Sequence, residues 1–334
     1  MRCYSAWNGC VVLVVLSLWM SPMVHVVAEE SARPIVIAHR GASGYLVEHT
    51  EGAKVLAHAQ GSDYIEQDVV LSKDRQFVVT HDITMEETTD VEDVYPERAR
   101  SDGKWYFADF DWQELQALSM HERTRRDSQT NVFPDRFPGR CGQRLMRLED
   151  EIQLLRGLDR TTGRQTGFYI ELKSPSFHER EFGESMGRRL VEQLGTWGIR
   201  DASDRCFIQC FEWDELERLG TELHCQLPLV YLLGRPIDRE ALEKASKLCY
   251  GIGPLLDLLA VRGPEGQIQS SGLVESAHAL GLRVHPYTVR LEMFPKWSSS
   301  TEETHRMLLE VLRVDGFFTD FPDLGRQAVD QSRP

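Results

Sequence analysis

Short apolar runs alternate with amphipathic segments along most of this chain, a pattern typical of α/β proteins. The first apolar run, at 35–38, leads into His39 and Arg40 and then into the small residues GASG. Its composition predicts a buried parallel strand. A helix is predicted at 51–60, where apolar residues recur at helical spacing and Gly61 provides the stop.

A β-hairpin is predicted next. YIEQDVVL at 64–71 and FVVTHD at 77–82 are separated only by the polar residues 72–75. From about 83 to 165 the regular pattern lapses, and only two helices are predicted there, at 112–120 and near 148–158. We interpret this segment as an insertion or small subdomain over one end of the main fold. An aromatic cluster in it forms either its own core, which we favour, or a substrate mouth: Trp105, Tyr106, Phe107, Phe110 and Trp112.

Regular alternation returns after the insertion. Predicted strands FYIELK (168–173), CFIQC (206–210), PLVYLL (228–233), YGIG (250–253), RVHPYT (283–288) and GFFT (316–319) alternate with helices at 180–197, 213–220, 238–248, 270–280 and 304–312. With the hairpin return left out, the chain has eight such strands. Eight strands alternating with helices predict a (β/α)8 TIM barrel, here over residues 34–330 with an insertion at about 83–165 after the second strand.

The first residues predict a signal peptide. An early arginine precedes an apolar run at 10–20, and small residues end at Ala28, after which we expect cleavage. An uncleaved anchor is the alternative, because residues 10–28 nearly span a bilayer core of about 30 Å. We expect a periplasmic or secreted protein without a stable membrane span after cleavage of residues 1–28.

The net charge and the number of cysteines limit which partners and which disulfide bonds we expect. The formal net charge of -14 disfavours a polyanion such as DNA or RNA, so we expect no nucleic-acid partner, and any phosphate must be held by local groups. Removal of the signal leaves an odd number of cysteines, so at least one is unpaired: Cys141, Cys206, Cys210, Cys225 and Cys249. We expect most of them to be small buried apolar residues. The sequence leaves the oligomeric state open.

Charged residues at alternate positions mark two of the strands. Glu66 and Asp68 share one face of a strand, about 7 Å apart, and repel each other unless a cation or a proton lies between them. A solvated edge strand is the alternative, but the apolar flanks argue against it. Glu171 and Lys173 repeat the spacing on the third barrel strand. We therefore predict a divalent metal site with oxygen ligands.

The two histidines that follow strands suggest proton transfer. His39 lies beside the permanent cation Arg40, which suits an anionic substrate, and His81 is a candidate acid to the base His39. The alternative is a hydrogen-bonded core histidine beside a surface charge. In a (β/α)8 barrel these residues meet, because active sites form at the carboxyl ends of the strands.

Taken together, an ordered set of motifs resembles the glycerophosphodiester phosphodiesterase family, and most of all its exported bacterial branch. The motifs are His39-Arg40-Gly41, Glu48-His49-Thr50, Glu66-x-Asp68, His81-Asp82, Glu171-x-Lys173 and the ending VDGFFTDFPD. The resemblance runs from about 34 to 323 and departs from the family at Val47, where proline is usual. It implies a barrel enzyme that hydrolyses glycerophosphodiesters to sn-glycerol 3-phosphate and an alcohol.

The resemblance also implies roles for individual residues. Glu66, Asp68 and Glu171 would bind a divalent cation, Ca²⁺ by preference and Mg²⁺ otherwise, while His39 and His81 would be the acid–base pair. Arg40 and Lys173 would hold phosphoryl oxygens, Glu48 would orient His39 or Arg40 within the substrate site, and Gln209 and Tyr287 would line the pocket. Two alternatives are a phospholipase D-like enzyme on intact lipids, marked by an exposed apolar loop at the mouth, and a non-catalytic surface binding protein.

Overall fold

The structure is a computed structural model that describes residues 33–125, 130–133, 136–137 and 142–332. The predicted signal peptide and its alternative as an anchor lie outside these residues, as does Cys141. Within the described residues no helix combines the length and the apolar character needed to cross a membrane.

The barrel consists of eight parallel strands in the order β12-β1-β2-β5-β6-β7-β8-β11. Their bounds are β1 (Ile35–Ala38), β2 (Tyr64–Leu71), β5 (Gly167–Leu172), β6 (Cys206–Cys210), β7 (Leu229–Leu233), β8 (Gly251–Pro254), β11 (Arg283–Val284) and β12 (Gly316–Thr319). The ring closes where Asp315 N donates to Val284 O at 3.1 Å and Phe318 N donates to Pro286 O at 2.9 Å. The predicted (β/α)8 barrel is confirmed.

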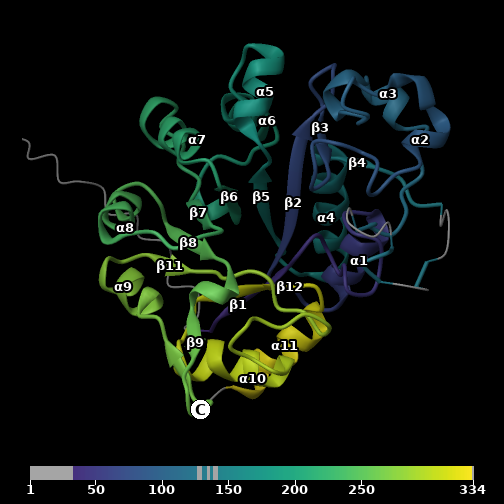
Figure 1. Ribbon diagram of the computed structural model, residues 1–334. Helices are drawn as coiled ribbons and strands as arrows, with labels where there is room; N and C mark the ends of the chain where they lie inside the picture. The colour runs from purple at the N-terminus through teal and green to yellow at the C-terminus, as the bar shows by residue number, and fades with distance from the viewer. Residues whose placement is uncertain (1–32, 126–129, 134–135, 138–141, 333–334) are drawn as a thin grey trace, which may run out of the picture. The chain divides into compact units, whose positions relative to one another are not determined.

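Helices surround the strands, as Figure 1 shows. They are α1 (Glu51–Ala59), α4 (Leu148–Thr162), α5 (Pro175–Phe182), α6 (Met186–Thr196), α7 (Trp213–Glu217), α8 (Arg239–Ser246), α9 (Leu273–Ala279), α10 (Thr301–Arg306) and α11 (Pro322–Gln331). Successive residues of a strand face opposite sides, so Ile65 and Ile170 pack in the cluster under the helices, whereas Tyr64 and Tyr169 fill the barrel interior. Because residues i and i+2 share a face, the alternation that buries Tyr64 and Tyr169 also turns Glu66 and Glu171 inward.

Two predicted helices differ in the structure. The helix expected at 180–197 is α5 and α6, because Gly183 ends α5 at φ 71° and Ser185 caps α6 by accepting from Arg188 N. The helix expected at 112–120 stops as α3 (Trp112–Leu115). After α3 the backbone pairs elsewhere, since Met120 N donates to Gln143 O at 2.9 Å. Helix α11 and the hairpin of β9 (Ala260–Arg262) and β10 (Ile268–Ser270) were not predicted.

The segment after the hairpin packs around a second hydrophobic cluster, which also includes Val47, Val70 and Val78. Strand β3 (Phe77–Val79) pairs antiparallel with β2, and β4 (Met146–Arg147) pairs with β3. Between them lie α2 (Val91–Val94), α3 and two short 3₁₀ turns at 96–98 and 107–109. The predicted aromatic core holds Trp105, Phe107 and Phe110, with Trp112 packed against it, while Tyr106 stacks on Phe177 at 5.5 Å. Helix α4 packs instead on the barrel through Leu148, Ile152 and Leu155.

The cysteines behave as small apolar residues, as predicted. Cys206, Cys210 and Cys249 are buried, Cys225 is half-buried, and all four are free thiols.

Candidate active site

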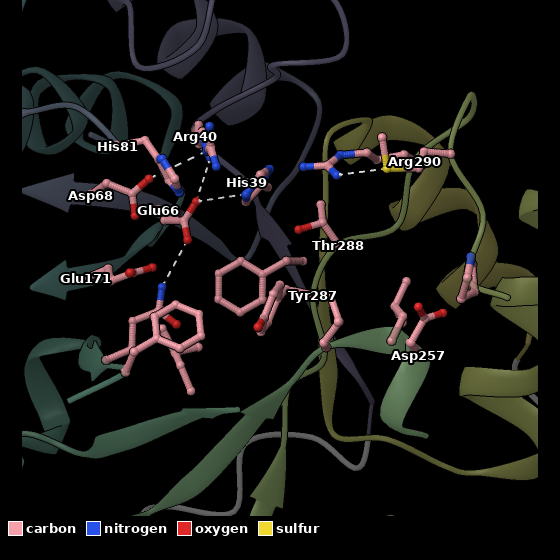
Figure 2. Close-up of a pocket in the computed structure, with 18 of the residues that line it drawn as sticks. His39, Arg40, Glu66, Asp68, His81, Glu171, Asp257, Tyr287, Thr288 and Arg290 are labelled. Carbon is pink, nitrogen blue, oxygen red and sulfur yellow. Dashed lines mark hydrogen bonds and ion pairs between the residues drawn. The ribbon is translucent and has the colours of Figure 1, made fainter. Parts of the chain in front are cut away.

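A cavity of about 230 Å³ lies at the carboxyl ends of the barrel strands. Each strand or the residues just after it contributes to the lining, which is polar on one side: His39, Arg40, Glu66, Asp68, His81, Glu171, Lys173, Gln209, Thr288 and Arg290. Figure 2 shows the carboxylates and histidines of this side around the cavity. The other side is mainly apolar: Phe211, Leu232, Leu255, Leu256, Tyr287, Met293, Phe294, Pro295 and Phe318, together with Asp257.

Strand register brings three carboxylates together. Asp68 is the direct partner of Glu171 across β2 and β5, and Glu66 precedes Asp68 on the same face. One oxygen of each carboxylate lies within 4.8 Å of the others, and all three side chains are buried. This spacing lets one cation contact all three, because calcium–oxygen distances are about 2.3–2.6 Å.

The electrostatics of these carboxylates also favour a cation. Burial, then the charges of Asp68 and Glu171, raises the pKa of Glu66 well above its usual value. Burial and the charge of Asp68 raise the pKa of Glu171 to about 7, against the attraction of Lys173. The buried Oδ1 of Asp68 accepts no hydrogen bond from an N–H or O–H group of the described residues. A divalent cation would relieve this repulsion and use that oxygen, so the residues present fit such an ion.

Neighbouring groups hold the carboxylates in place. Arg40 adopts φ 57°, which aims its amide at Glu66 Oε2 at 2.9 Å, and Gln209 Nε2 donates to Glu66 Oε1 at 3.0 Å. His49 Nε2 lies 2.9 Å from Asp68 Oδ2. Burial alone would raise the pKa of Asp68, but the charge of Lys173 and the contact with His49 keep it well below its usual value. These contacts fix the direction of each ligand oxygen.

The first histidine is part of a chain of three side chains. His39 Nδ1 lies 2.5 Å from Asp320 Oδ1, and Asp320 Oδ2 accepts from Arg290 Nε at 2.8 Å. Nε2 of His39 lies 3.9 Å from Glu66 Oε2. Burial, Arg40 and Arg290 lower the pKa of His39, and Asp320 opposes them. Nδ1 of the ring is thus bound to Asp320, and Nε2 is directed to the carboxylates.

The second histidine has a carboxylate partner of its own. His81 Nδ1 lies 3.0 Å from Asp82 Oδ1, and the ring is 31% exposed at the cavity. Desolvation of the ring by the surrounding protein, followed by the charges of Arg40 and Lys173, lowers the pKa of His81 to about 3. In Figure 2, Arg40 lies between the rings of His39 and His81.

Two cations face the carboxylates. Lys173 Nζ donates to Glu171 Oε1 at 2.6 Å, and Arg40 Nε lies 3.6 Å from Asp68 Oδ2. The predicted residue Glu48 lies behind Arg40, whose Nη1 contacts its two oxygens at 3.0 and 3.1 Å. Arg123, which lies between β3 and β4 in the chain, also donates to both oxygens of Glu48, at 2.7 and 2.8 Å. Glu48 is thus occupied with orienting Arg40, and the other predicted residues line the cavity.

Sequence reasoning missed several residues of the site. Asp320 belongs to the motif VDGFFTDFPD, and His49 follows Glu48 in another quoted motif, so a signal existed for both but their roles were not assigned. No pattern marked Arg290 or Arg123. Tyr287, predicted to line the pocket, does so with its hydroxyl donating to Leu233 O at 3.2 Å and its ring 5.9 Å from that of Phe211.

Similar proteins were found by sequence and by structure. The chain matches the glycerophosphoryl diester phosphodiesterase family over residues 39–324. It is 36% identical over 322 residues to a glycerophosphodiester phosphodiesterase of Haemophilus influenzae, covering 87% of this chain and 88% of the relative. It is 33% identical over 341 residues to one of Treponema pallidum, covering 93% of this chain and 96% of the relative.

Solved structures share the fold. An Oleispira antarctica phosphodiesterase in complex with the product sn-glycerol-3-phosphate matches with a TM-score of 0.62 and 21% identity, covering 89% of this chain and 97% of that chain. A glycerophosphodiester phosphodiesterase from Agrobacterium tumefaciens matches with a TM-score of 0.58 and 22% identity, covering 88% and 99%.

Proposed function

The chain belongs to the glycerophosphoryl diester phosphodiesterase family, and we propose that it hydrolyses glycerophosphodiesters to sn-glycerol 3-phosphate and an alcohol. The observation that carries this proposal is the gathering of three carboxylates, two histidines and two cations in one cavity. The product named for the Oleispira antarctica enzyme supports the same substrate class. The expected ligand of the cavity is therefore a small soluble diester, the substrate.

Glu66, Asp68 and Glu171 are proposed to hold a divalent cation. Their three oxygens and the unpartnered Oδ1 of Asp68 support a hard cation, Ca²⁺ by preference and Mg²⁺ otherwise. When bound, the cation supplies positive charge that polarises the phosphoryl group. Arg40 and Lys173 are proposed to bind the remaining phosphoryl oxygens, where charge increases in the transition state.

The two histidines are proposed to move the protons. His39 acts as the base, since Asp320 holds its Nδ1 and stabilises the positive charge that the ring acquires. His81 acts as the acid that protonates the leaving oxygen. Arg40 and Lys173 contribute to the low pKa of His81, so the negative charge of a bound phosphodiester would raise that pKa by offsetting them.

The attacking group is proposed to be the 2-hydroxyl of the substrate's glycerol. Among the described residues the cavity lining contains no Ser or Cys, and its one aliphatic hydroxyl, that of Thr288, is not hydrogen-bonded to a histidine. An attached hydroxyl gains the proximity advantage of a tethered nucleophile. Its attack on phosphorus would break the bond to the leaving alcohol and form a five-membered cyclic phosphodiester of glycerol, which a water molecule would then open to sn-glycerol 3-phosphate. A diester of 1,3-propanediol, which lacks that hydroxyl, should be cleaved poorly. Equal cleavage of both diesters would rule out the hydroxyl and leave direct attack by water.

Product analysis tests the activity. Incubation with sn-glycero-3-phosphocholine should release glycerol 3-phosphate and choline in equal amounts. Release of glycerol and phosphocholine would place the broken bond on the other side of the phosphorus and contradict the proposal. No release under any metal condition would favour the non-catalytic binding protein.

One observation favours the second candidate, a phospholipase D-like enzyme. Leu291, Met293 and Phe294 are exposed in a loop beside the cavity, and such a loop was the expected mark of action on intact lipids. The cavity of about 230 Å³ argues against two acyl chains entering it, since pockets for drug-sized ligands measure roughly 300–1,000 Å³. Choline release from a diacyl lipid, compared with release from glycerophosphocholine, separates the two activities.

Export to the periplasm or the medium is also proposed, as in the exported bacterial branch of the family. Its support is the apolar run and the small residues before Ala28. N-terminal sequencing of the mature protein should begin at Glu29, and an intact N-terminus on a membrane-bound protein would favour the anchor. The boundaries 34–330 for the barrel and 83–165 for the insertion are proposed on the pattern of the sequence.

A further inference from the structure

Exposed apolar side chains gather at the cavity. Of the described residues, the large apolar side chains with the greatest exposure are Phe211 (42%), Val261 (55%), Leu291 (40%), Met293 (49%), Phe294 (39%) and Val311 (60%). Three of the six belong to the loop 290–295, and Phe211, Met293 and Phe294 line the catalytic cavity itself. Single exposed apolar residues are normal, but a group at the rim of a binding cavity indicates a binding surface.

The loop that carries this group is held by specific contacts. Arg290 Nη1 lies 3.7 Å from Met293 Sδ, and the same guanidinium donates to Asp320. At the other end, Lys296 N donates to Asp257 Oδ1 at 2.7 Å, and the buried Trp297 donates to Leu256 O at 2.8 Å. The apolar side chains are therefore presented by an anchored loop.

The opposite rim completes an apolar mouth, which we define as Phe211, Leu255, Tyr287, Met293 and Phe294. Phe211 packs edge-on against Tyr287, with ring centroids 5.9 Å apart. Lys173 Nζ lies 5.8 Å from the centroid of Phe211, so the apolar mouth begins beside a proposed phosphate ligand. A group attached to the bound phosphate has only a short distance to cross before it reaches apolar surface.

We infer that the apolar mouth is the subsite for the leaving alcohol, and that the enzyme prefers glycerophosphodiesters whose alcohol carries an apolar chain. This inference rests on the proposed function, which places phosphate and glycerol on the polar side of the cavity. Figure 2 shows Glu66, Asp68 and Glu171 on the opposite side of the cavity from Tyr287. A single chain can leave the small cavity along Met293 and Phe294 toward the exposed Leu291.

The one carboxylate on the apolar side gives little charge selection for a cationic head group. Asp257 is the carboxylate on the apolar side, and its charge is offset by Lys296, whose amide donates to Oδ1 and whose Nζ lies 3.8 Å from Oδ2. Apolar burial, in contrast, strengthens binding by up to about fourfold for each methylene that leaves water.

A series of substrates tests the inference. For sn-glycero-3-phospho esters of methanol, butanol and hexanol, kcat/KM should rise about two- to fourfold per methylene until the chain passes the mouth. The double variant Met293→Ser/Phe294→Ser should lose most of this dependence on chain length. Val311→Ser removes an equally exposed apolar side chain outside the cavity lining, and it should keep the dependence. The inference is overturned if kcat/KM does not change with chain length, or if the double variant shows the same increase as the wild type.

Two further measurements keep the result unambiguous. Calorimetric Kd values for methyl, butyl and hexyl phosphate should fall with chain length in the wild type but not in the double variant. These Kd values test the inference even if the protein hydrolyses no diester. Absence of hydrolysis would refute the proposed function and not the apolar subsite. Sedimentation with phosphatidylcholine vesicles tests a membrane surface as the occupant. If the wild type binds vesicles, the double variant does not, and neither kcat/KM nor Kd depends on alkyl chain length, the apolar mouth is a lipid-contact surface and the inference is overturned.

Discussion

Asp320 Oδ1 and His39 Nδ1 lie 2.5 Å apart, although 281 residues separate the two in the sequence. His39 follows β1 and Asp320 follows β12, and these strands are neighbours in the barrel. Asp320 therefore fixes both the orientation and the tautomer of the proposed base. Arg290 binds the second oxygen of Asp320 and connects the same carboxylate to the loop at the mouth.

Asp320→Asn should lower kcat by roughly 10²- to 10⁴-fold, the range typical of acid–base groups, with little change in KM. The amide keeps the shape of the carboxylate but removes the charge that stabilises a protonated His39. Steady-state kinetics with glycerophosphocholine measure both constants. Asp315→Asn is the matched control, because Asp315 binds His278 at 2.8 Å away from the cavity. An unchanged kcat in Asp320→Asn would remove His39 from the role of base.

The sequence could predict the carboxylates but not this pair. Glu66 and Asp68 lie on one strand, where the alternation of faces is a local property, and the parallel register then adds Glu171. The contact between His39 and Asp320 depends on closure of the barrel, which brings the first and last strands together. Local spacing contains no information about such a contact.

Other differences from the sequence-based prediction have local causes. Gly183 divides one apolar-periodic segment into α5 and α6 by adopting a left-handed conformation that periodicity alone does not reveal. The apolar residues of the loop 290–295 follow neither a helical nor a strand period, so their place at the cavity could be learned only from the fold. Barrel strands, in contrast, were predicted because each is a short apolar run bounded by polar residues.

His81→Ala should lower kcat by a similar roughly 10²- to 10⁴-fold, because the leaving alkoxide would lose its proton donor. The effect should shrink for a diester with a good leaving group such as p-nitrophenol, which needs little protonation. Kinetics with both substrates measure this difference. If His81→Ala raised only KM, His81 would be a binding residue.

Glu66→Gln should abolish ion binding while the fold survives. Removing one of three crowded carboxylates relieves their repulsion, so the variant should unfold at or above the melting temperature of the metal-free wild type. Ca²⁺ at a hundredfold excess over Kd should stabilise the wild type by about 2.7 kcal/mol and leave the variant unchanged.

A matched buried carboxylate provides the control for that experiment. Glu151 on α4 pairs with Lys54 at 2.9 Å on the outer side of β2. Glu151→Gln should lower the melting temperature, because it leaves a buried ammonium without its counter-charge, yet it should keep the Ca²⁺-dependent increase. A normal Ca²⁺ response in Glu66→Gln would remove Glu66 from the ligand set.

His178 should make stability depend on pH. Its ring is buried against Phe182, neither nitrogen has a hydrogen-bond partner among the described residues, and burial lowers its pKa from 6.5 to about 4. The unfolded chain binds a proton near pH 6.5 that the folded chain rejects until about pH 4. This contribution to stability is therefore complete above pH 6.5 and is lost as the pH falls toward 4, by an amount on the order of 3 kcal/mol.

His178→Phe should remove that part of the pH dependence, because an apolar ring has no proton to gain. Urea unfolding at pH 7 and pH 5 measures the difference in free energy of unfolding for both proteins. The difference should be smaller in the variant, and an equal difference would show that His178 does not titrate in this range.

The central claim is that the three carboxylates hold a divalent cation on which diester hydrolysis depends. The most direct measurement is glycerol 3-phosphate release from sn-glycero-3-phosphocholine after the protein is treated with a chelator and dialysed, and again after Ca²⁺ or Mg²⁺ is restored. Release should fall to the background rate without metal and return when the ion is added. Full release by protein shown by elemental analysis to be free of metal would contradict the account.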